Sequence, residues 1–302
     1  MFRHVFWPLL LWFSLSLFAS GWAQRVQLFL SWNLKPYWEF AEGFEKTHLF
    51  ETYVVVVEVE PSIVEGTVAL VPVGHRALKF LLKKRTSLPM WGALILHPSL
   101  VNTENLLGGL YLRLPPRVFL PVLREELDKL PLFKKRHINL GIPYSDPHNL
   151  QFIEEVALWA PIWDFQIITL PLNDWQSFQK NLSQTEVVYF IPDPFLESEE
   201  VLSRLLKMVV LEGKLVVGYN RFFLEKGAFL AFLIDYKRAG KKAAQALKNC
   251  LEKKLCGWIH APFKLKRNKK ALQYFLNLHH RKEKETSKKG EPLVSSFSHT
   301  LR

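Results

Sequence analysis

Short apolar runs alternate with amphipathic stretches along most of the chain. Runs of Val, Ile, Leu and Phe between turn residues predict buried strands, and apolar residues at helical spacing predict helices packed against them. In the first part of the chain, the predicted strands are 25–30, 53–59, 67–73, 90–96 and 110–114, and the predicted helices are 36–47, 75–84 and 117–130.

The same alternation restarts, more regularly, after a segment rich in Gly and Pro at 108–116. The pattern predicts strands at 137–141, 165–170, 187–191, 214–218 and 228–234, and helices at 147–159, 174–181, 198–210, 236–255 and 269–277. Residues 281–302 are polar and show no periodicity, which predicts a disordered tail.

The fold class follows from this alternation. Strands without an exposed polar face, each followed by a helix, indicate parallel sheets covered by helices on both faces. Two such series predict an α/β protein with two Rossmann-like lobes. Ligands of such sheets bind beyond the carboxyl ends of the strands, so residues at the strand tips are the candidates for a site.

The N-terminus has the pattern of a secretory signal peptide. Arg3 precedes an apolar run at 5–18, and Gly21 and Ala23 form a small-x-small ending. We expect cleavage after Ala23 and a periplasmic product that is not lipid-anchored, since no Cys lies near that point. The alternative is a retained anchor helix, although the run is short for a bilayer of about 30 Å and Pro8 interrupts it.

Composition and charge exclude some classes. With 49% hydrophobic and 14% aromatic residues, the 302-residue chain is neither disordered, collagen-like nor a disulfide-stapled mini-protein. Residues 237–302 hold 18 Lys and Arg against 4 Asp and Glu, whereas the rest of the chain holds 22 against 24. A nucleic-acid footprint is one interpretation. In an exported chain we expect instead a solvated helix face, contact with anionic lipid or ion pairing.

The two cysteines, Cys250 and Cys256, lie six residues apart on one predicted helix. Their separation along the helix axis would be roughly 9 Å, and a bridge would require the helix to end between them. We therefore predict that both are free or merely packed, and we expect no metal site from two Cys alone.

Motifs of known chemistry are missing from the sequence. The chain has no phosphate-binding glycine motif, no His-Glu-x-x-His, no Gly-x-Ser-x-Gly and no Cys/His cluster at metal spacing. His279-His280 in the basic segment is expected to be a solvated pair. We therefore predict no cofactor, no metal and no enzymatic activity, although catalytic triads assemble in space and not in sequence.

The strand tips hold a set of polar and aromatic residues that can recognise a small zwitterionic or polar aromatic ligand. Arg221 can clamp a carboxylate, and an Asp can pair with an ammonium group. Asp193 precedes a proline, so it has the alternative role of ordering a turn or capping a helix. The candidates are Trp32, Gly74, His75, His97, Tyr144, Asp193, Asn220, Arg221 and Asp235.

Several of these residues lie in segments that resemble one family. VYFIPDP at 188–194, LVVGYNRF at 215–222, KGAFL at 226–230 and VGHRAL at 73–78 are similar, in the same order, to segments of exported ABC transporter substrate-binding proteins. Asp235-Tyr236 and the segment 266–271 add to the resemblance. The group in question has the type I periplasmic-binding fold and is assigned to aromatic amino acids and related solutes.

The resemblance implies an organisation and a function. Residues 24–112 with 236–280 would form the N-terminal lobe and 113–235 the C-terminal lobe, and a solute would bind between lobes that close on it. Carried over by position, the contacts would be Gly74, His75, Asp193, Asn220, Arg221 and Asp235. The chain would capture a small organic solute for the permease of an ABC importer, as a monomer and without nucleic acid.

The chain departs from the family at two places. Only Glu60–Gly66 separates two strands where the family has a crossover helix, and parallel neighbours need about a dozen connecting residues. Either these strands are not parallel neighbours or the first lobe is trimmed. His75 also replaces a small hydroxyl residue. The alternative function is therefore a sensory or scaffold relative with a degenerate cleft, and a periplasmic enzyme is a third possibility.

Overall fold

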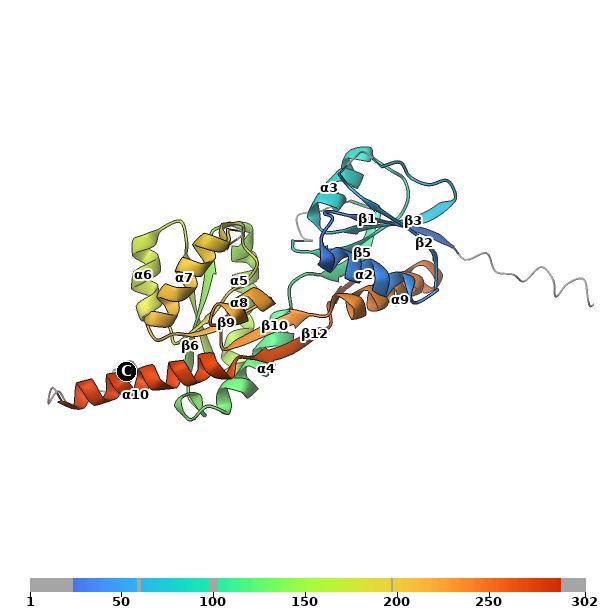
Figure 1. The fold of residues 1–302 in the computed structure, drawn as a ribbon. Helices are drawn as coiled ribbons and strands as arrows, with labels where there is room; N and C mark the ends of the chain where they lie inside the picture. Colours follow the sequence, from blue (N-terminus) through green and yellow to red (C-terminus); the bar gives the residue numbers. More distant parts are fainter. Residues whose placement is uncertain (1–23, 59–60, 98–102, 197, 289–302) are drawn as a thin grey trace, which may run out of the picture. The chain divides into compact units, whose positions relative to one another are not determined.

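The computed structural model describes residues 24–58, 61–97, 103–196 and 198–288. These residues form two compact α/β units (Figure 1). Within the described ranges, unit 1 comprises residues 24–95, 103–110 and 236–259, and unit 2 comprises 96–97, 111–235 and 260–288. The predicted signal peptide lies outside the described residues.

Unit 1 is built on a six-stranded sheet in the order β11-β5-β4-β3-β1-β2. β1 pairs in parallel with β2 and β3, and β3 pairs in parallel with β4. β1 is buried along almost its whole length, as expected for a central strand covered on both faces. The strands are β1 (Arg25–Leu30), β2 (Glu51–Val56), β3 (Thr67–Val73), β4 (Met90–Ile95), β5 (Leu106–Tyr111) and β11 (Trp258–His260).

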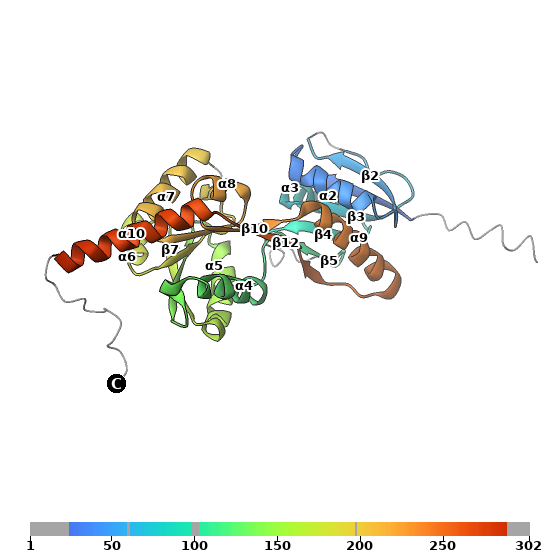
Figure 2. The same ribbon diagram turned by 60° about the horizontal axis from the view of Figure 1, so that its bottom comes forward.

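Three helices accompany this sheet: α2 (Lys35–Glu45), α3 (His75–Lys84) and α9 (Tyr236–Lys253). α2 and α9 lie side by side in both views (Figures 1 and 2). Two glycines allow this close approach, because a Cβ on Gly43 would collide with the carbonyl of Lys237, and a Cβ on Gly240 with the carbonyl of Phe40. The pair therefore packs backbone against backbone.

The short connection between β2 and β3 is explained by the strand order. β1 lies between the two strands, so they are not parallel neighbours, and none of the described residues between them is helical. The fully buried Gln27 of β1 holds the connection in place. Its Nε2 donates to the Ser62 carbonyl over 3.0 Å, and its Oε1 accepts the Val64 amide over 2.9 Å. Ile63 between them packs on the hydrophobic cluster of this unit.

Unit 2 is built on a second six-stranded sheet, in the order β12-β10-β9-β8-β6-β7. Its strands pair in parallel except β12, which runs antiparallel to β10. The strands are β6 (Ile138–Tyr144), β7 (Phe165–Pro171), β8 (Val187–Tyr189), β9 (Leu215–Gly218), β10 (Leu230–Ile234) and β12 (Phe263–Arg267).

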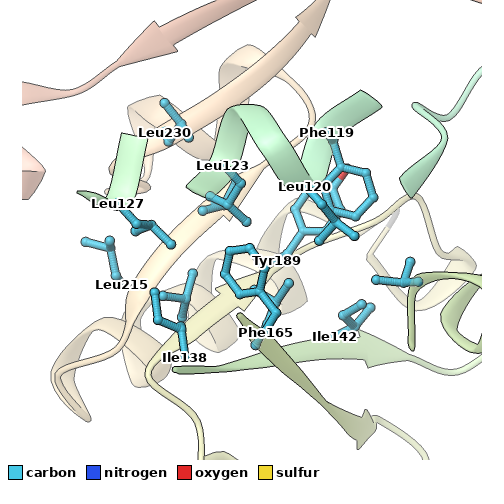
Figure 3. Close-up of a cluster of buried hydrophobic side chains, with 14 of the residues drawn as sticks. Phe119, Leu120, Leu123, Leu127, Ile138, Ile142, Phe165, Tyr189, Leu215 and Leu230 are labelled. Atoms are coloured by element: carbon cyan, nitrogen blue, oxygen red, sulfur yellow. The ribbon is translucent and has the colours of Figure 1, made fainter. Parts of the chain in front are cut away.

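Helices cover the second sheet and enclose its core. Figure 3 shows apolar side chains of α4 facing side chains of the strands, among them Phe119, Leu123 and Leu127 against Ile138, Tyr189 and Leu215. The helices are α4 (Pro116–Asp128), α5 (His148–Trp159), α6 (Trp175–Ser183), α7 (Glu199–Leu211), α8 (Arg221–Glu225) and α10 (Lys269–Lys288), with short 3-10 turns η2 (Pro131–Phe133), η3 (Ala160–Trp163) and η4 (Pro194–Leu196).

The C-terminal part of the chain differs from the prediction. The strands β11 and β12 were not predicted, because one has three residues and the other alternates basic and apolar residues at a sheet edge. Because β12 pairs with β10, residues 260–280 belong to unit 2 and not to the N-terminal lobe. α10 continues to Lys288, so 281–288 are helical and not disordered, while 289–302 lie outside the described residues.

The cysteine prediction was wrong. Cys250 and Cys256 form a disulfide, with their Cα atoms 4.4 Å apart. The condition for a bridge is met because α9 ends at Lys253, between the two residues. Lys254 then adopts a left-handed conformation, with φ 57°, which turns the chain back toward the helix. The bridge joins the end of α9 to the segment that leads into β11.

Among the described residues, no helix is long and apolar enough to cross a membrane.

We expect Gln27→Leu to lower the free energy of unfolding of unit 1 by about 1–3 kcal/mol, because it leaves the Val64 amide and the Ser62 carbonyl without partners. Urea unfolding measures this change. Gln166→Leu, on the exposed side of edge strand β7, is the matched control and should change stability by less than about 0.5 kcal/mol. Equal effects of the two substitutions would contradict a structural role for Gln27.

Candidate functional site

The Asp193 carboxylate organises the carboxyl edge of the unit 2 sheet. Its Oδ2 accepts the amides of Ser145 and Asp146 over 2.8 and 3.1 Å, and the Asn149 side-chain amide over 2.7 Å. Its Oδ1 accepts the Ser145 hydroxyl over 2.5 Å and the Phe195 amide over 3.0 Å. The loops that follow β6 and β8 are therefore joined through one buried carboxylate.

These contacts fit the loop-ordering role considered for Asp193, and its contact with a ligand stays a prediction. A carboxylate has about four acceptor sites, and five donors already occupy them. Burial raises the pKa of Asp193, but the hydrogen bonds from Ser145, Asp146 and Phe195 outweigh it and hold the pKa below its ordinary value. The contacts are those of a residue that orders loops, and an ammonium group of a ligand is not needed to complete them.

A buried cation, Arg113, lies beside this carboxylate network. Its side chain donates to Asn149 Oδ1, lies 3.3 Å from His97 Nε2 and 3.5 Å from the Pro192 carbonyl, and packs over the ring of Phe152 at 4.8 Å. Arg113 is only 7% exposed, and its Nε has no hydrogen-bond partner among the described residues.

The charge of Arg113 is not neutralised by a direct ion pair. Within the part of the chain that the structure describes, no carboxylate lies within ion-pair distance of its guanidinium, and Asp146 and Asp193 act on it only over longer distances. Burial lowers the pKa of Arg113 to about 10, so the side chain remains a cation at neutral pH. The Arg113 guanidinium is therefore a buried positive charge with no ion-pair partner among the described residues.

Two histidines flank Asp146 next to Arg113. His148 Nδ1 lies 2.7 Å from Asp146 Oδ1, and His97 Nε2 lies 3.9 Å from Asp146 Oδ2. The two imidazole rings are 5.8 Å apart. Burial raises the pKa of Asp146, but hydrogen bonds from His148 outweigh this effect and lower it. Asp146 is therefore a carboxylate that fixes the position of both rings.

A second set of residues gathers at the carboxyl edge of the unit 1 sheet. Ser31 follows β1, and its hydroxyl accepts the Ala77 amide over 2.9 Å, which caps the start of α3. Gly74 has φ 88°, and a Cβ there would lie 2.6 Å from Ser31 Oγ, so glycine is required. His75 begins α3, and burial together with Lys79 lowers its pKa. The 47% exposed Trp32 lies under the Arg76 guanidinium at 4.2 Å.

The remaining candidates also belong to unit 2. Tyr144, the last residue of β6, packs on the main hydrophobic cluster. Asn220 caps α8, and Arg221 is the exposed first residue of that helix. The Asp235 carboxylate lies 2.7 Å from the Lys264 ammonium, and its amide donates to the Pro262 carbonyl.

The predicted candidates therefore fall into groups. Trp32, Gly74 and His75 come together in unit 1, while His97, Tyr144 and Asp193 lie in one region of unit 2 with Arg113. Across the described ranges, no group of three His, Cys, Asp or Glu side chains is placed to hold a metal ion.

Sequence reasoning missed Arg113, Asn149, Asp146 and His148. Arg113 was placed inside a strand predicted at 110–114, but β5 ends at Tyr111, so the residue follows a strand tip after all. A correct strand boundary would have found it. Asn149 lies in the first turn of α5 and is completely buried, and no pattern of spacing marks such a residue.

The chain is similar in fold to several solved structures. A conserved domain protein from Vibrio cholerae matches with a TM-score of 0.58, 16% identity, and coverage of 84% of this chain and 94% of its own. An ABC domain from Streptococcus pneumonia in complex with L-Trp matches with a TM-score of 0.55, 14% identity, and coverage of 84% and 94%. A ligand-free substrate-binding protein with adhesive properties from Clostridium difficile matches with a TM-score of 0.61 and 12% identity. The match covers 83% of this chain and 94% of that protein.

These likenesses establish the fold. The chain has a two-lobed α/β fold, as the strand pattern predicted, and this fold is that of type I periplasmic binding proteins, as the family resemblance implied. No family model and no curated protein matches the sequence.

We expect Asp193→Asn to lower the free energy of unfolding of unit 2 by about 1–3 kcal/mol at neutral pH, because an amide cannot accept all five hydrogen bonds. The native pKa of Asp193 lies below the ordinary value of 3.8. Its contribution is therefore present above about pH 4 and is lost as the pH falls through the native pKa, so the variant should lose less stability on acidification.

Denaturant unfolding at a series of pH values measures this difference. Asp164→Asn is the matched control, because Asp164 is exposed and asparagine is favourable at its left-handed φ of 56°. Parallel curves for Asp193→Asn and the wild type would show that the carboxylate does not carry the pH dependence.

Proposed function

We propose that this chain is a solute-binding protein of an ABC importer and that its solute carries an anionic group. The solute is a small organic acid of the amino-acid or aromatic-acid class. The observation that supports this most strongly is Arg113, a buried cation at the carboxyl edge of a parallel sheet with an unpaired Nε and no direct ion pair among the described residues.

A second buried arginine of the same unit, Arg124, has a structural role. Arg124 is also 7% exposed, but it forms an ion pair with Asp128 at 2.7 Å and donates to the carbonyls of Phe133 and Arg136. Its charge is satisfied within the protein. Arg113 has the same burial without a carboxylate partner, and uncompensated buried charges are costly unless they serve a site.

The other groups at the carboxyl edges fit the same class of solute. In unit 1, Trp32 and Arg76 offer an exposed aromatic face and a second cation, and His75 and Gly74 lie next to them. In unit 2, Arg221 and Asn220 follow β9, and His97 and Tyr144 accompany Arg113. We expect the residues of each set to serve as solute contacts. Asp193 and Asp235 are further proposed solute contacts of unit 2, and Asp193 also orders the loops after β6 and β8.

The proposed function also includes export and a membrane partner. The chain would be exported to the periplasm through a signal peptide cleaved after Ala23, without a lipid anchor. It would act as a monomer that presents its solute to a membrane permease and performs no covalent chemistry. Two of the matching structures are described as a complex with L-Trp and as a substrate-binding protein, which agrees with this class of function.

A thermal-shift screen over amino acids and small aromatic acids tests the proposal. A solute present at about 100 times its dissociation constant should stabilise the protein by about 2.7 kcal/mol. Uncharged analogues that lack the carboxylate should give no shift. If no anionic solute raises the melting temperature, the chain does not bind this class, and a scaffold or sensory role takes its place.

Once a solute is found, we expect Arg113→Met to abolish its binding and to change the stability of the free protein by less than about 1 kcal/mol, since the lost hydrogen bonds are offset by removal of a buried charge. Calorimetric titration measures the affinity. Arg124→Met is the matched control: it should cost about 1–3 kcal/mol of stability and leave the affinity unchanged.

Arg221→Ala tests the second cation of unit 2. We expect this variant to lose solute affinity with little loss of stability, because Arg221 is exposed at the start of α8. The control is Arg204→Ala, because Arg204 is an exposed arginine of α7 that pairs with Glu200. This variant should change neither the solute affinity nor the stability. A lower melting temperature with unchanged affinity would make Arg221 a structural residue.

A further inference from the structure

The amino edge of the unit 2 sheet is a separate surface, formed by the segments that precede β6, β7, β8 and β9. Backbone hydrogen bonds join these segments, from Ile138 to Asp164, from Glu186 to Asn139 and from Leu215 to Glu186. This edge lies at the opposite end of the strands from Arg113 and Asp193. A ligand on one edge therefore leaves the other accessible.

The helix α10 starts at this edge and continues along it. Asn268, which precedes the helix, donates its amide to the Phe229 carbonyl at the start of β10. Farther along, Phe275 stacks on Phe133, and His279 Nε2 lies 3.2 Å from the Gly213 carbonyl. The last turns of α10 then run past the rest of unit 2 (Figures 1 and 2).

Large apolar side chains are exposed at this edge. Leu158 is 79% exposed, Ile162 64% and Leu211 54%, and Trp159 is 38% exposed. Leu158, Trp159 and Ile162 lie where α5 and η3 lead into β7, and Leu211 ends α7 ahead of β9. Apolar side chains this exposed, flanked by polar residues, mark surfaces that contact a partner or a membrane.

Exposed cations lie among these apolar residues. Those at the amino edge and on the free part of α10 are Lys134, Lys135, Lys180, Arg281 and Lys284. Two acidic residues of this edge are paired, Glu186 with Arg136 and Asp128 with Arg124, while the exposed Asp164 and Glu212 lie beside Ile162 and Leu211 in the sequence. The five exposed cations outnumber these two exposed carboxylates, and they accompany leucine, isoleucine and tryptophan side chains at the same edge.

We propose that the amino edge of unit 2, together with α10, docks on the surface of an anionic lipid bilayer. The lysines and Arg281 would contact lipid head groups, and near a membrane each contributes about 1 kcal/mol. Leu158, Trp159, Ile162 and Leu211 would enter the interfacial layer, where Trp and aliphatic side chains are favoured. This contact would hold the protein at the membrane while the carboxyl edge of unit 2 remains free.

An environment-sensitive fluorophore on Ile162→Cys tests the contact. The two native cysteines form a disulfide, so the new thiol is labelled selectively. We expect a blue shift of the emission with vesicles of phosphatidylcholine and phosphatidylglycerol, and none with phosphatidylcholine alone. The shift should disappear in 1 M salt, where the Debye length is about 3 Å.

Two controls place the contact on the amino edge. The same label on Trp175→Cys, at the carboxyl edge of unit 2, should show no shift. Lys134→Glu/Lys135→Glu should weaken partitioning to anionic vesicles at least tenfold, whereas Lys83→Glu/Lys84→Glu at the exposed end of α3 should leave it unchanged.

Several results would overturn the proposal. It fails if the label at residue 162 does not shift, if it shifts equally on neutral vesicles, or if the label at residue 175 responds as strongly. A salt-sensitive response to an acidic protein or a nucleic acid, in the absence of any response to anionic vesicles, would assign the edge to that partner instead.

Discussion

The parallel pairing of the strands decides where the chemistry of this chain lies. In a parallel sheet all carboxyl ends meet at one edge and all amino ends at the other, so each edge collects loops that are far apart in the sequence. In unit 2 the carboxyl edge gathers Arg113, Asn149 and Asp193, and the amino edge gathers apolar and basic residues. In unit 1 the carboxyl edge gathers Trp32 and Gly74.

The two buried charges at the carboxyl edge of unit 2 have different consequences. Asp193 is satisfied by five donors and makes the loops after β6 and β8 a rigid frame. Arg113 is held by that frame through Asn149 but is not neutralised by it. The arrangement thus fixes the position of a cation while leaving it without a counter-ion, which is the electrostatic condition for selecting an anionic solute.

Much of the fold was accessible from the sequence because buried parallel strands leave long apolar runs. β1, β3 and α3 have the predicted bounds, and the two-lobed class is correct. Three features of the fold could not be predicted from the sequence. The half-exposed edge strand β12 lacks an apolar run, the disulfide depends on where α9 ends, and the β2–β3 connection depends on β1 lying between the two strands.

The candidate site could be predicted only in part, because the roles of its residues depend on partners from other elements. Strand tips can be read from the sequence, and they pointed to Trp32, Gly74, His97 and Asp193. The partners that give those residues their roles come from other elements, such as Asn149 of α5. The state of Arg113 depends on burial and on the absence of a nearby carboxylate among the described residues, and neither can be read from a linear pattern.

A crystal structure of the protein with its solute bound tests most directly whether Arg113 binds the anionic group. We expect the anionic group of the solute to lie within hydrogen-bond distance of the Arg113 guanidinium. A solute bound away from Arg113 would contradict the role proposed for this residue.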